Sequence, residues 1–548
     1  MHHAGVLVYK SPVTPFDDNK NSISNMGLNV PTTSNETITA FVGRALRGPV
    51  NQPVSLHDFA DYQRVFGGLW QPSALAYAVE QYFEHGGKHA VVVRVVNGGV
   101  PTTIKLPCAK QTLMLQARAL GSREFLRASV DYDNLADQDT DCFNLVIQRV
   151  RAHRSEYIEQ QETYRRISIS PNSGRFVSAV LMESALVQVA GAVPMVRPDP
   201  TPGQDARQVV GYVNSSPEGH DGAPLTDYDL IGSAAENTGL FALRALARFD
   251  LLYLPPLTRE QDVGLSALLV ASRFCRERHA MLVMDPLLAW QSVQAALTGL
   301  RQFNFACDQA LMFFPRLLAH DRLRGRPDAF ANGGAVAGML SHADERCPVW
   351  DGRQSEPELL LRPGVRLQLE VSEMDRWRLA AQGVNSLQTV RRSAPLTLVR
   401  RTLAGGVNAA ADWSYVQARR FALHIMGQLE RSTRWVLLAS PSRSMWARIV
   451  RQVNGFLHEL VAMGAFPGAT AGLEFFVICD ERINSITPGS TEMNILVGYA
   501  ALQSDQYHTF MITHSLSGSH TRMVAVNRYD TPSRFDDVEL TGNVLALR

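Results

Sequence analysis

Short apolar runs alternate with helical patterns along much of this chain, and this alternation restricts the fold more than any other feature of the sequence. Thr37 to Val42 is a run rich in β-forming residues, and Val91 to Val96 is a second one. The segment between them places four apolar residues on one face of a helix: Leu75, Val79, Tyr82 and Phe83. A strand, a helix and a second strand in this order predict a βαβ crossover, the building unit of a parallel sheet.

The same alternation returns in the middle of the chain. Phe249 to Leu254, Ala280 to Met284 and Ala310 to Phe314 read as buried strands. Between the first two, Val263 to Phe274 carries apolar residues at helical spacing. We therefore expect a parallel sheet with helices on both faces.

The residues between these two regions follow a different pattern. Phe143 to Val150 and Phe176 to Val180 are short alternating segments, which favour a small β-rich unit. Four prolines mark its end and predict a stiff linker: Pro194, Pro198, Pro200 and Pro202. We expect a β-rich domain at residues 101–205, inserted into the α/β domain.

The last third of the chain contains two further helical stripes. Apolar residues at spacings of three and four form the first one: Tyr415, Ala418, Ala422, Ile425 and Leu429. The second stripe consists of Trp446, Val450, Val453, Leu457 and Leu460. Trp435 to Leu438 and Phe475 to Ile478 are predicted as buried strands.

Composition excludes several classes of protein. The chain has 548 residues, and 53 Lys and Arg balance 52 Asp and Glu, so a net charge of +1 does not favour nucleic acid or an anionic membrane. Its six cysteines form no CxxC pair, which disfavours a zinc site and a disulfide framework. The sequence has no run of eighteen apolar residues and no signal-peptide core. We expect no cofactor and no membrane insertion, and we expect the chain to assemble in the cytoplasm.

Five motifs in order between residues 40 and 96 resemble the start of the core domain of contractile tail sheath proteins. They are AFVG (40–43), RGPVN (47–51), FADYQRVFGG (59–68), YAVEQYFEHGG (77–87) and VVVRVV (91–96). A second series resembles the C-terminal domain of the same family: QGVNSLQTV (382–390), RTLAGG (401–406), WSYVQARRF (413–421), RWVLLASPSRSMWARI (434–449) and GLEFFVICDERIN (472–484). Such proteins sheathe phage tails, R-type pyocins and extracellular contractile injection systems.

The resemblance implies an α/β fold with a subtilisin-like core built on the parallel sheet. The layout it implies is an extended arm at 1–36, a core at 37–100 and 206–385, the inserted β-rich domain at 101–205, an α/β sheath domain at 386–505, and a C-terminal arm and extension at 506–548.

The implied function is structural. Copies of the subunit would polymerise as stacked hexameric rings around an inner tube protein and contract to drive that tube through a target envelope. Baseplate and terminator or cap proteins are the other implied partners, and lysis would release the finished particle. Two alternatives remain open: a catalytically diverged subtilisin-fold hydrolase, and a ring-forming cap or baseplate protein with the same fold.

Sequence patterns of catalysis do not support an enzyme. The contexts in which subtilisins carry their Asp, His and Ser are missing, and so are a GxSxG elbow and a Walker A sequence. His220-Asp221-Gly222 reads as a turn, and His514 and His520 have no carboxylate at a useful position. We therefore predict no active site and no metal site.

Arginines concentrate in the C-terminal third. The clusters are Arg391-Arg392, Arg400-Arg401 and Arg419-Arg420, together with Arg431 and Arg434. They form either a solvated face or a surface for an acidic partner. The resemblance implies an inner-tube contact, for which we expect Arg419 and Arg420. Interleaved aromatic residues are absent, so we expect no nucleic-acid partner.

Both chain ends are candidates for strand addition to neighbouring subunits, because an extended segment can satisfy the open amides and carbonyls of a sheet edge. Val6, Val8 and Tyr9 supply the N-terminal candidate, and Phe510 and Ile512 the C-terminal one. The chain runs on through Met523 to Val526, so this later segment could be the linking strand instead, or the tail could pack on its own domain.

Overall fold

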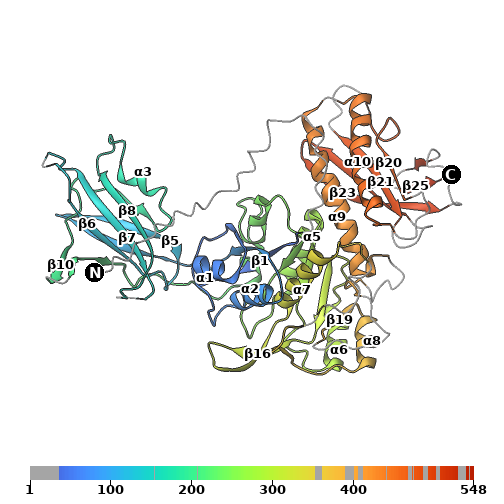
Figure 1. Ribbon diagram of the computed structural model, residues 1–548, viewed down its shortest axis with the longest axis horizontal. Coiled ribbons are helices and arrows are strands. Elements are labelled where there is room, and N and C mark those ends of the chain that lie inside the picture. Colours follow the sequence, from blue (N-terminus) through green and yellow to red (C-terminus); the bar gives the residue numbers. More distant parts are fainter. Residues whose placement is uncertain are drawn as a thin grey trace. The chain divides into compact units, whose positions relative to one another are not determined.

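The computed structural model describes residues 36–528 apart from short gaps, together with two strands near the C-terminus, residues 538–541 and 544–547 (Figure 1). The gaps are residues 137, 153–154, 206–207, 352–358, 360, 389–399, 405–411, 440, 467–471, 473, 486–491 and 501–506. Two compact units divide the described chain, the first within residues 34–427 and the second within residues 428–548. Of the expected N-terminal arm, only Glu36 lies within the described residues.

A seven-stranded sheet forms the centre of the first unit. Its strand order is β19-β15-β14-β13-β1-β3-β2, and every neighbouring pair is parallel except β2 with β3. The strands are β1 (Ile38–Gly43), β2 (Pro53–Leu56), β3 (His89–Arg94), β13 (Leu251–Tyr253), β14 (Met281–Met284), β15 (Ala310–Phe314) and β19 (Val384–Ser386). The predicted parallel sheet is therefore confirmed, with a strand at each apolar run.

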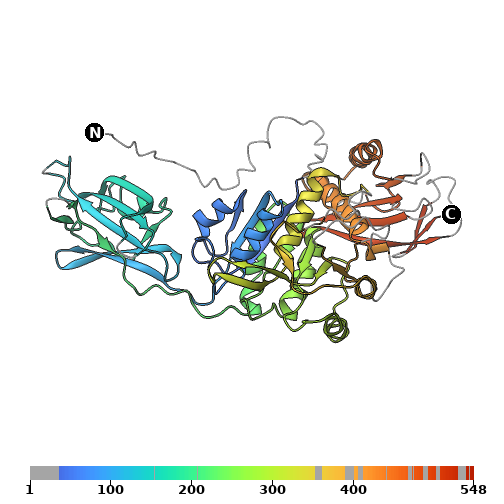
Figure 2. The ribbon, with the colours of Figure 1, turned by 60° about the horizontal axis from the view of Figure 1, so that its bottom comes forward.

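Helices cover both faces of this sheet. Alternate residues of β1 point to opposite sides: Phe41 packs edge-on against Tyr82 of α2, whereas Ala40 and Val42 belong to the core that contains Phe274 of α5. Helices α2 (Leu75–Glu84) and α7 (Gly333–Arg346) pack side by side on the Phe41 face, as Figure 2 shows in blue and yellow. The other face carries η1 (Gly239–Ala245), α5 (Leu265–Arg278) and α6 (Val293–Phe303).

Smaller elements complete the core of the first unit. Further helices of this part are α1 (Phe59–Phe66), α4 (Asp227–Ile231) and α8 (Glu373–Ala380). Strands β16 (Leu317–Asp321), β17 (Arg326–Phe330) and β18 (Arg366–Leu367) form a separate small antiparallel sheet that follows β15. Helix α2 begins after Ala74, which makes no side-chain cap hydrogen bond. The Ser73 hydroxyl, one residue earlier, accepts a hydrogen bond from the Leu75 amide at 3.1 Å.

The predicted β-rich insertion is a sandwich of two antiparallel sheets. One sheet contains β4 (Pro101–Cys108), β5 (Gln111–Leu120) and β9 (Val187–Ala190). The other contains β6 (Leu126–Asp131), β7 (Cys142–Val150), β8 (Ile158–Ser168) and β12 (Val213–Asn214), and a hairpin of β10 (Pro202–Asp205) and β11 (Gln208–Val210) precedes β12. Their inner faces share one core, in which Leu106, Leu115, Val130 and Leu145 are fully or almost fully buried.

Three details of this domain differ from the prediction. Residues 176–180 were expected to be extended, but Val177–Leu181 is the short helix α3. The proline segment is attached to the sandwich instead of acting as a linker, because the Asp199 amide donates to the Pro107 carbonyl and the Thr201 amide to the Val130 carbonyl. The domain also extends beyond residue 205, since β12 pairs with β6.

The second unit packs two helices on a six-stranded sheet. Helix α9 (Val416–Thr433) contributes its last turns, and α10 (Arg443–Ala462) lies entirely within this unit. The strand order is β20-β21-β22-β23-β25-β24, with bounds β20 (Phe475–Ile478), β21 (Met493–Ala500), β22 (Tyr507–Ser515), β23 (Gly518–Arg528), β24 (Val538–Thr541) and β25 (Val544–Leu547).

Both predicted helical stripes are confirmed by α9 and α10, and the predicted strand at Phe475 to Ile478 is β20. The predicted strand at Trp435 to Leu438 is wrong, because this segment is a turn of 3-10 helix, η4 (Arg434–Leu438), that directly follows α9. The expected boundary at residue 505 is also absent, since β22 pairs with β21 and β23 inside one sheet.

Candidate functional site: assembly surfaces and closed strand ends

Arg420, one of the two residues expected to face an inner tube, is buried inside the first unit. Its side chain lies on α9 and is 7% exposed, and the Asp344 side chain that it meets on α7 is 2% exposed. The Nη1 atom donates to Asp344 Oδ1 at 2.9 Å, and Nη2 donates to Oδ2 in a second hydrogen bond. Burial opposes the charge, but the Asp344 carboxylate outweighs it, so the pKa of Arg420 lies above its ordinary value.

Arg419 is buried as well. It is 4% exposed, its Nη2 atom lies 3.1 Å from Asp308 Oδ2, and its guanidinium stacks on the Trp413 ring at 5.0 Å. An exposed basic face at Arg419 and Arg420 is therefore a wrong prediction. The partners of these arginines are acidic residues of α7 and of the loop before β15. Both lie far away in the sequence, so the arginine pattern alone suggested a charged surface.

Exposed arginines of the second unit include three on α10, besides Arg434, Arg482 and Arg522 elsewhere. Arg443, Arg448 and Arg451 are exposed, and Ala447 and Gly455 are small residues on the same side of the helix. Arg443 pairs with Glu481 at 2.7 Å, and Arg448 stacks on Trp435 at 4.5 Å. The opposite side of α10 is buried: Met445, Trp446, Ile449, Gln452, Val453, Phe456, Leu457 and Leu460.

The residues expected to add a strand to a neighbour divide into two groups. Val6, Val8 and Tyr9 lie outside the described residues. Phe510 and Ile512 are buried in β22, where Phe510 faces Val497 of β21 and Met523 of β23. Because β22 has a partner strand on each side within its own chain, its backbone groups are already paired. The later segment, Met523 to Val526, lies in β23 and also has two neighbours, β22 and β25.

The open edges of this sheet lie elsewhere. In the described strand order, β20 and β24 are the outermost strands and each has one neighbour. Outer strands leave half of their amides and carbonyls available to another extended segment.

The carboxyl ends of the parallel strands, where α/β proteins usually bind ligands, are filled by side chains of the chain itself. Asp285 follows β14 and accepts hydrogen bonds from the Tyr253 hydroxyl at 2.6 Å and from the Gly333 amide at 2.8 Å. Burial raises the pKa of Asp285, and Arg316 opposes that shift. Arg316 itself lies 3.2 Å from Asp262.

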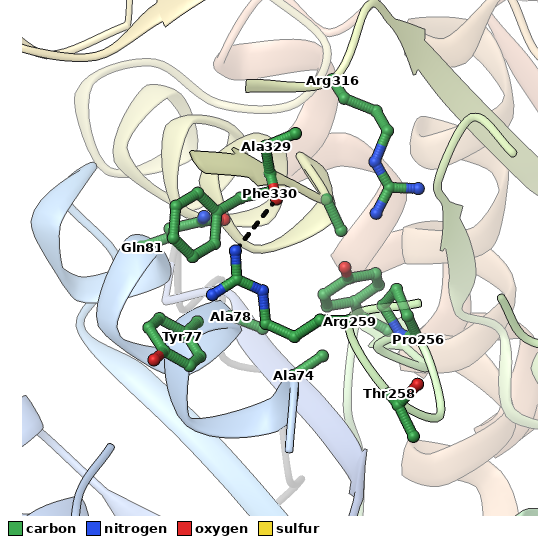
Figure 3. A pocket seen from close by; sticks show the side chains of 12 residues that line it. Ala74, Tyr77, Ala78, Gln81, Pro256, Thr258, Arg259, Arg316, Ala329 and Phe330 are labelled. Atoms are coloured by element: carbon green, nitrogen blue, oxygen red, sulfur yellow. Dashed lines mark hydrogen bonds between the residues drawn. The ribbon is translucent and has the colours of Figure 1, made fainter. Parts of the chain in front are cut away.

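A narrow pocket at the same end of the sheet contains a second buried ion network (Figure 3). Arg259 lies between the rings of Tyr77 and Phe330, at 5.1 and 4.2 Å, and its Nη2 atom donates to the Ala329 carbonyl. Its guanidinium also pairs with Asp321 at 2.5 Å and with Asp328 at 3.0 Å. Arg259, Asp321 and Asp328 thus bind one another within the chain.

The histidines considered for catalysis in the sequence analysis, His220 and His514, lie in a turn and in a buried contact. The Gly222 amide donates to His220 Nδ1 at 3.2 Å, and Asp221 accepts from the backbone and hydroxyl of Ser122, so the predicted turn is confirmed. His514 is fully buried and lies 2.8 Å from the Thr433 hydroxyl and 2.6 Å from the Ser519 hydroxyl. Burial lowers the pKa of His514 to about 4, so this imidazole is neutral at pH 7.

The described residues contain neither a candidate membrane span nor a candidate metal site. Among them, no helix combines the length and the apolar content that a bilayer span requires. Within the same residues, no group of three or more His, Cys, Asp or Glu side chains is placed to hold a metal ion.

Arg94 is a structural residue that the sequence analysis missed. It is 1% exposed within β3, and it donates to the carbonyls of Ala45 at 3.1 Å, Gly48 at 2.7 Å and Leu120 at 2.8 Å. Burial lowers its pKa to about 10, and Asp221 is the strongest opposing group. This side chain fixes the loop that carries the RGPVN motif. The available signal was a single arginine inside an otherwise apolar strand.

Comparison with known proteins relates this fold to that of solved structures. The sequence matches no family model and no curated protein. Among solved structures, the sheath tail protein from Listeria innocua is similar over 90% of this chain and 96% of its own, with a TM-score of 0.57 and 11% identity. The sheath tail protein from Desulfitobacterium hafniense is similar over 89% of this chain and 98% of its own, with a TM-score of 0.52 and 10% identity. The chain therefore has the fold of the tail sheath proteins.

Proposed function

We propose that this chain is the sheath subunit of a contractile tail or injection machine. Copies polymerise around an inner tube and contract to drive the tube through a target envelope. The observation that carries the proposal is the likeness to two sheath tail proteins over nearly their full length, 96% and 98% of those chains. The two motif series at residues 40–96 and 382–484, which resemble the same family, also support it.

Assembly follows from a repeated contact that does not close. A heterologous interface between identical subunits generates a helical filament unless its rotation closes a ring. We propose stacked hexameric rings with a subtilisin-like arrangement of the core, assembled in the cytoplasm and attached to a baseplate at one end and a terminator at the other. Negative-stain electron microscopy of the purified full-length chain tests this. Regular tubes are the expected result, and closed rings without tubes would favour a cap or baseplate protein.

The inner-tube contact is reassigned to α10. Its exposed arginines, Arg443, Arg448 and Arg451, can meet an acidic tube surface, whereas Arg419 and Arg420 are used inside the subunit. Exposed ion pairs are individually weak, which suits a contact that sets register and must release during contraction.

Strand addition is proposed for the N-terminal arm. Val6, Val8 and Tyr9 would pair with an open edge of a neighbouring copy's C-terminal sheet, at β20 or β24. Replacing Val6 and Val8 together by proline removes two amide donors and should abolish long tubes while the subunit stays soluble. The matched control is the double threonine variant, which keeps both amides and a β-branched shape. If the proline variant still forms full-length tubes, the arm does not link subunits by strand addition.

A diverged hydrolase is the second candidate. The filled strand ends around Asp285, Arg316 and Arg259 weigh against it, because a hydrolase needs an accessible nucleophile and base there. Peptidase turnover by a monomeric preparation would favour the hydrolase and contradict the sheath proposal.

A further inference from the structure

Asp344 lies where three elements of the first unit meet. Its side chain projects from α7 and is almost fully buried. The hydroxyl of Thr37, the residue before β1, donates to its Oδ2 atom. The Arg420 guanidinium of α9 donates to both carboxylate oxygens. One carboxylate thus holds the start of the first strand and the first half of the long helix.

These two contacts depend on each other physically. A buried carboxylate needs both a paired charge and hydrogen bonds to remain ionised. Arg420 and Thr37 share the Oδ2 atom, so the threonine hydroxyl helps to set the side-chain rotation at which the planar guanidinium can bind both oxygens. Losing one partner therefore weakens the geometry of the other contact.

The surroundings make this carboxylate the centre of a charged cluster. Arg400 lies nearby, and its pKa is lowered to about 10 by burial and by Arg420, against the attraction of Asp344. The Ile38 amide, next to Thr37, donates to Asp250 at 2.8 Å. The start of β1 is thus held by two carboxylates, and Asp344 is the one that also binds α9.

We propose that Asp344 couples the N-terminal strand to α9, so that loosening one of these elements loosens the other. Residues 1–36 precede Thr37, and α9 continues into the second unit at residue 428. If the arm binds a neighbouring subunit, tension on it would reach α9 through Asp344. That mechanical role rests on the proposed function, whereas the coupling within one subunit does not.

Amide hydrogen exchange of the full chain, monitored by mass spectrometry, tests the coupling. Thr37→Val keeps the shape of the side chain and removes the hydroxyl, and it should speed exchange of α9 amides at residues 420–427 about tenfold, the size expected for a hydrogen bond to a charged group. Thr39→Val is the matched control, because Thr39 lies two residues further along, within β1, and its hydroxyl faces Tyr82 instead of Asp344. Its α9 exchange should stay within about twofold of the parent chain.

The reverse experiment uses reciprocity, since coupling between two sites acts equally in both directions. Arg420→Lys keeps the charge but loses the two-pronged contact, and it should speed exchange at residues 38–40. Glu124→Gln breaks another buried ion pair, with Arg149 in the inserted domain, and should leave both regions unchanged. Equal α9 exchange in the Thr37 and Thr39 variants, or an unchanged strand β1 in Arg420→Lys, would overturn the coupling. Tube formation by the parent chain tests the sheath proposal separately.

Discussion

Helices α9 and α10 carry similar sequence patterns, a stripe of apolar residues with arginines between them, but they use the arginines in opposite ways. On α9, Arg419 and Arg420 point into the first unit and bind Asp308 and Asp344. On α10, Arg448 and Arg451 are exposed. The comparison shows that the residues packed around a helix decide whether its arginines form internal ion pairs or an exposed surface.

Burial explains why the arginines of α9 and those of α10 contribute differently to stability. Arg420 and Asp344 are removed from water, so each charge depends on the other for its stabilisation. An exposed arginine is hydrated whether or not it has a partner. α9 is buried on nearly all sides over residues 416–430, while α10 has one buried and one exposed face. Replacing arginine by glutamate should therefore lower the stability of the subunit in α9, whereas in α10 it should mainly weaken tube binding.

The largest effect should come from reversing the buried charges. Replacing Arg419 and Arg420 together by glutamate places each new carboxylate against an aspartate, and breaking even one buried pair costs about 3–5 kcal/mol. Because a domain has a total stability of about 5–15 kcal/mol, we expect little soluble folded protein. Circular dichroism and urea unfolding measure this. A double variant as stable as the parent would show that the two ion pairs contribute nothing to folding.

A second effect depends on pH and acts at the other end of α9. His514 has a pKa of about 4 in the folded chain and about 6.5 when unfolded. The unfolded chain therefore binds more protons between these values, and stability falls as the pH drops from about 6.5 to about 4, by up to about 3 kcal/mol. Urea unfolding at a series of pH values measures the slope.

The control for this titration is His514→Gln, which cannot gain the proton. Its stability should be lower at pH 7, because the contacts with Thr433 and Ser519 change. Between pH 6.5 and 4 it should vary less with pH than the parent chain. An identical pH slope in parent and variant would contradict a neutral, buried His514.

The smallest effect on stability should come from α10. Replacing Arg448 and Arg451 by glutamate should change the free energy of unfolding by less than about 0.5 kcal/mol, as expected for exposed positions. Co-sedimentation with the inner tube protein should nevertheless fall, because an acidic tube surface would then repel the helix. Normal co-sedimentation of this folded variant would remove α10 from the tube contact.

The sequence predicted the core better than it predicted the surfaces. Strands β1, β3, β13, β14 and β15 are apolar runs buried on both faces, and this pattern depends only on local residues. Helices α2, α5, α9 and α10 followed from apolar spacing in the same way.

Features that depend on distant partners could not be read from the sequence. The burial of Arg420 requires Asp344, which lies 76 residues earlier in the chain. The internal position of β22 requires β21 and β23 on either side, so a short apolar segment near the C-terminus looked like an arm. Trp435 to Leu438 has the composition of a strand, but it directly follows α9 and continues it as a 3-10 turn.

The most direct test of the account is a cryo-electron microscopy reconstruction of particles that contain this chain and its inner tube. The account predicts a helical stack of subunits in which the exposed face of α10 lines the lumen and an N-terminal segment of one copy pairs with an outer strand of another. A reconstruction that shows closed rings without stacking, or a stack with α10 facing away from the tube, would contradict it.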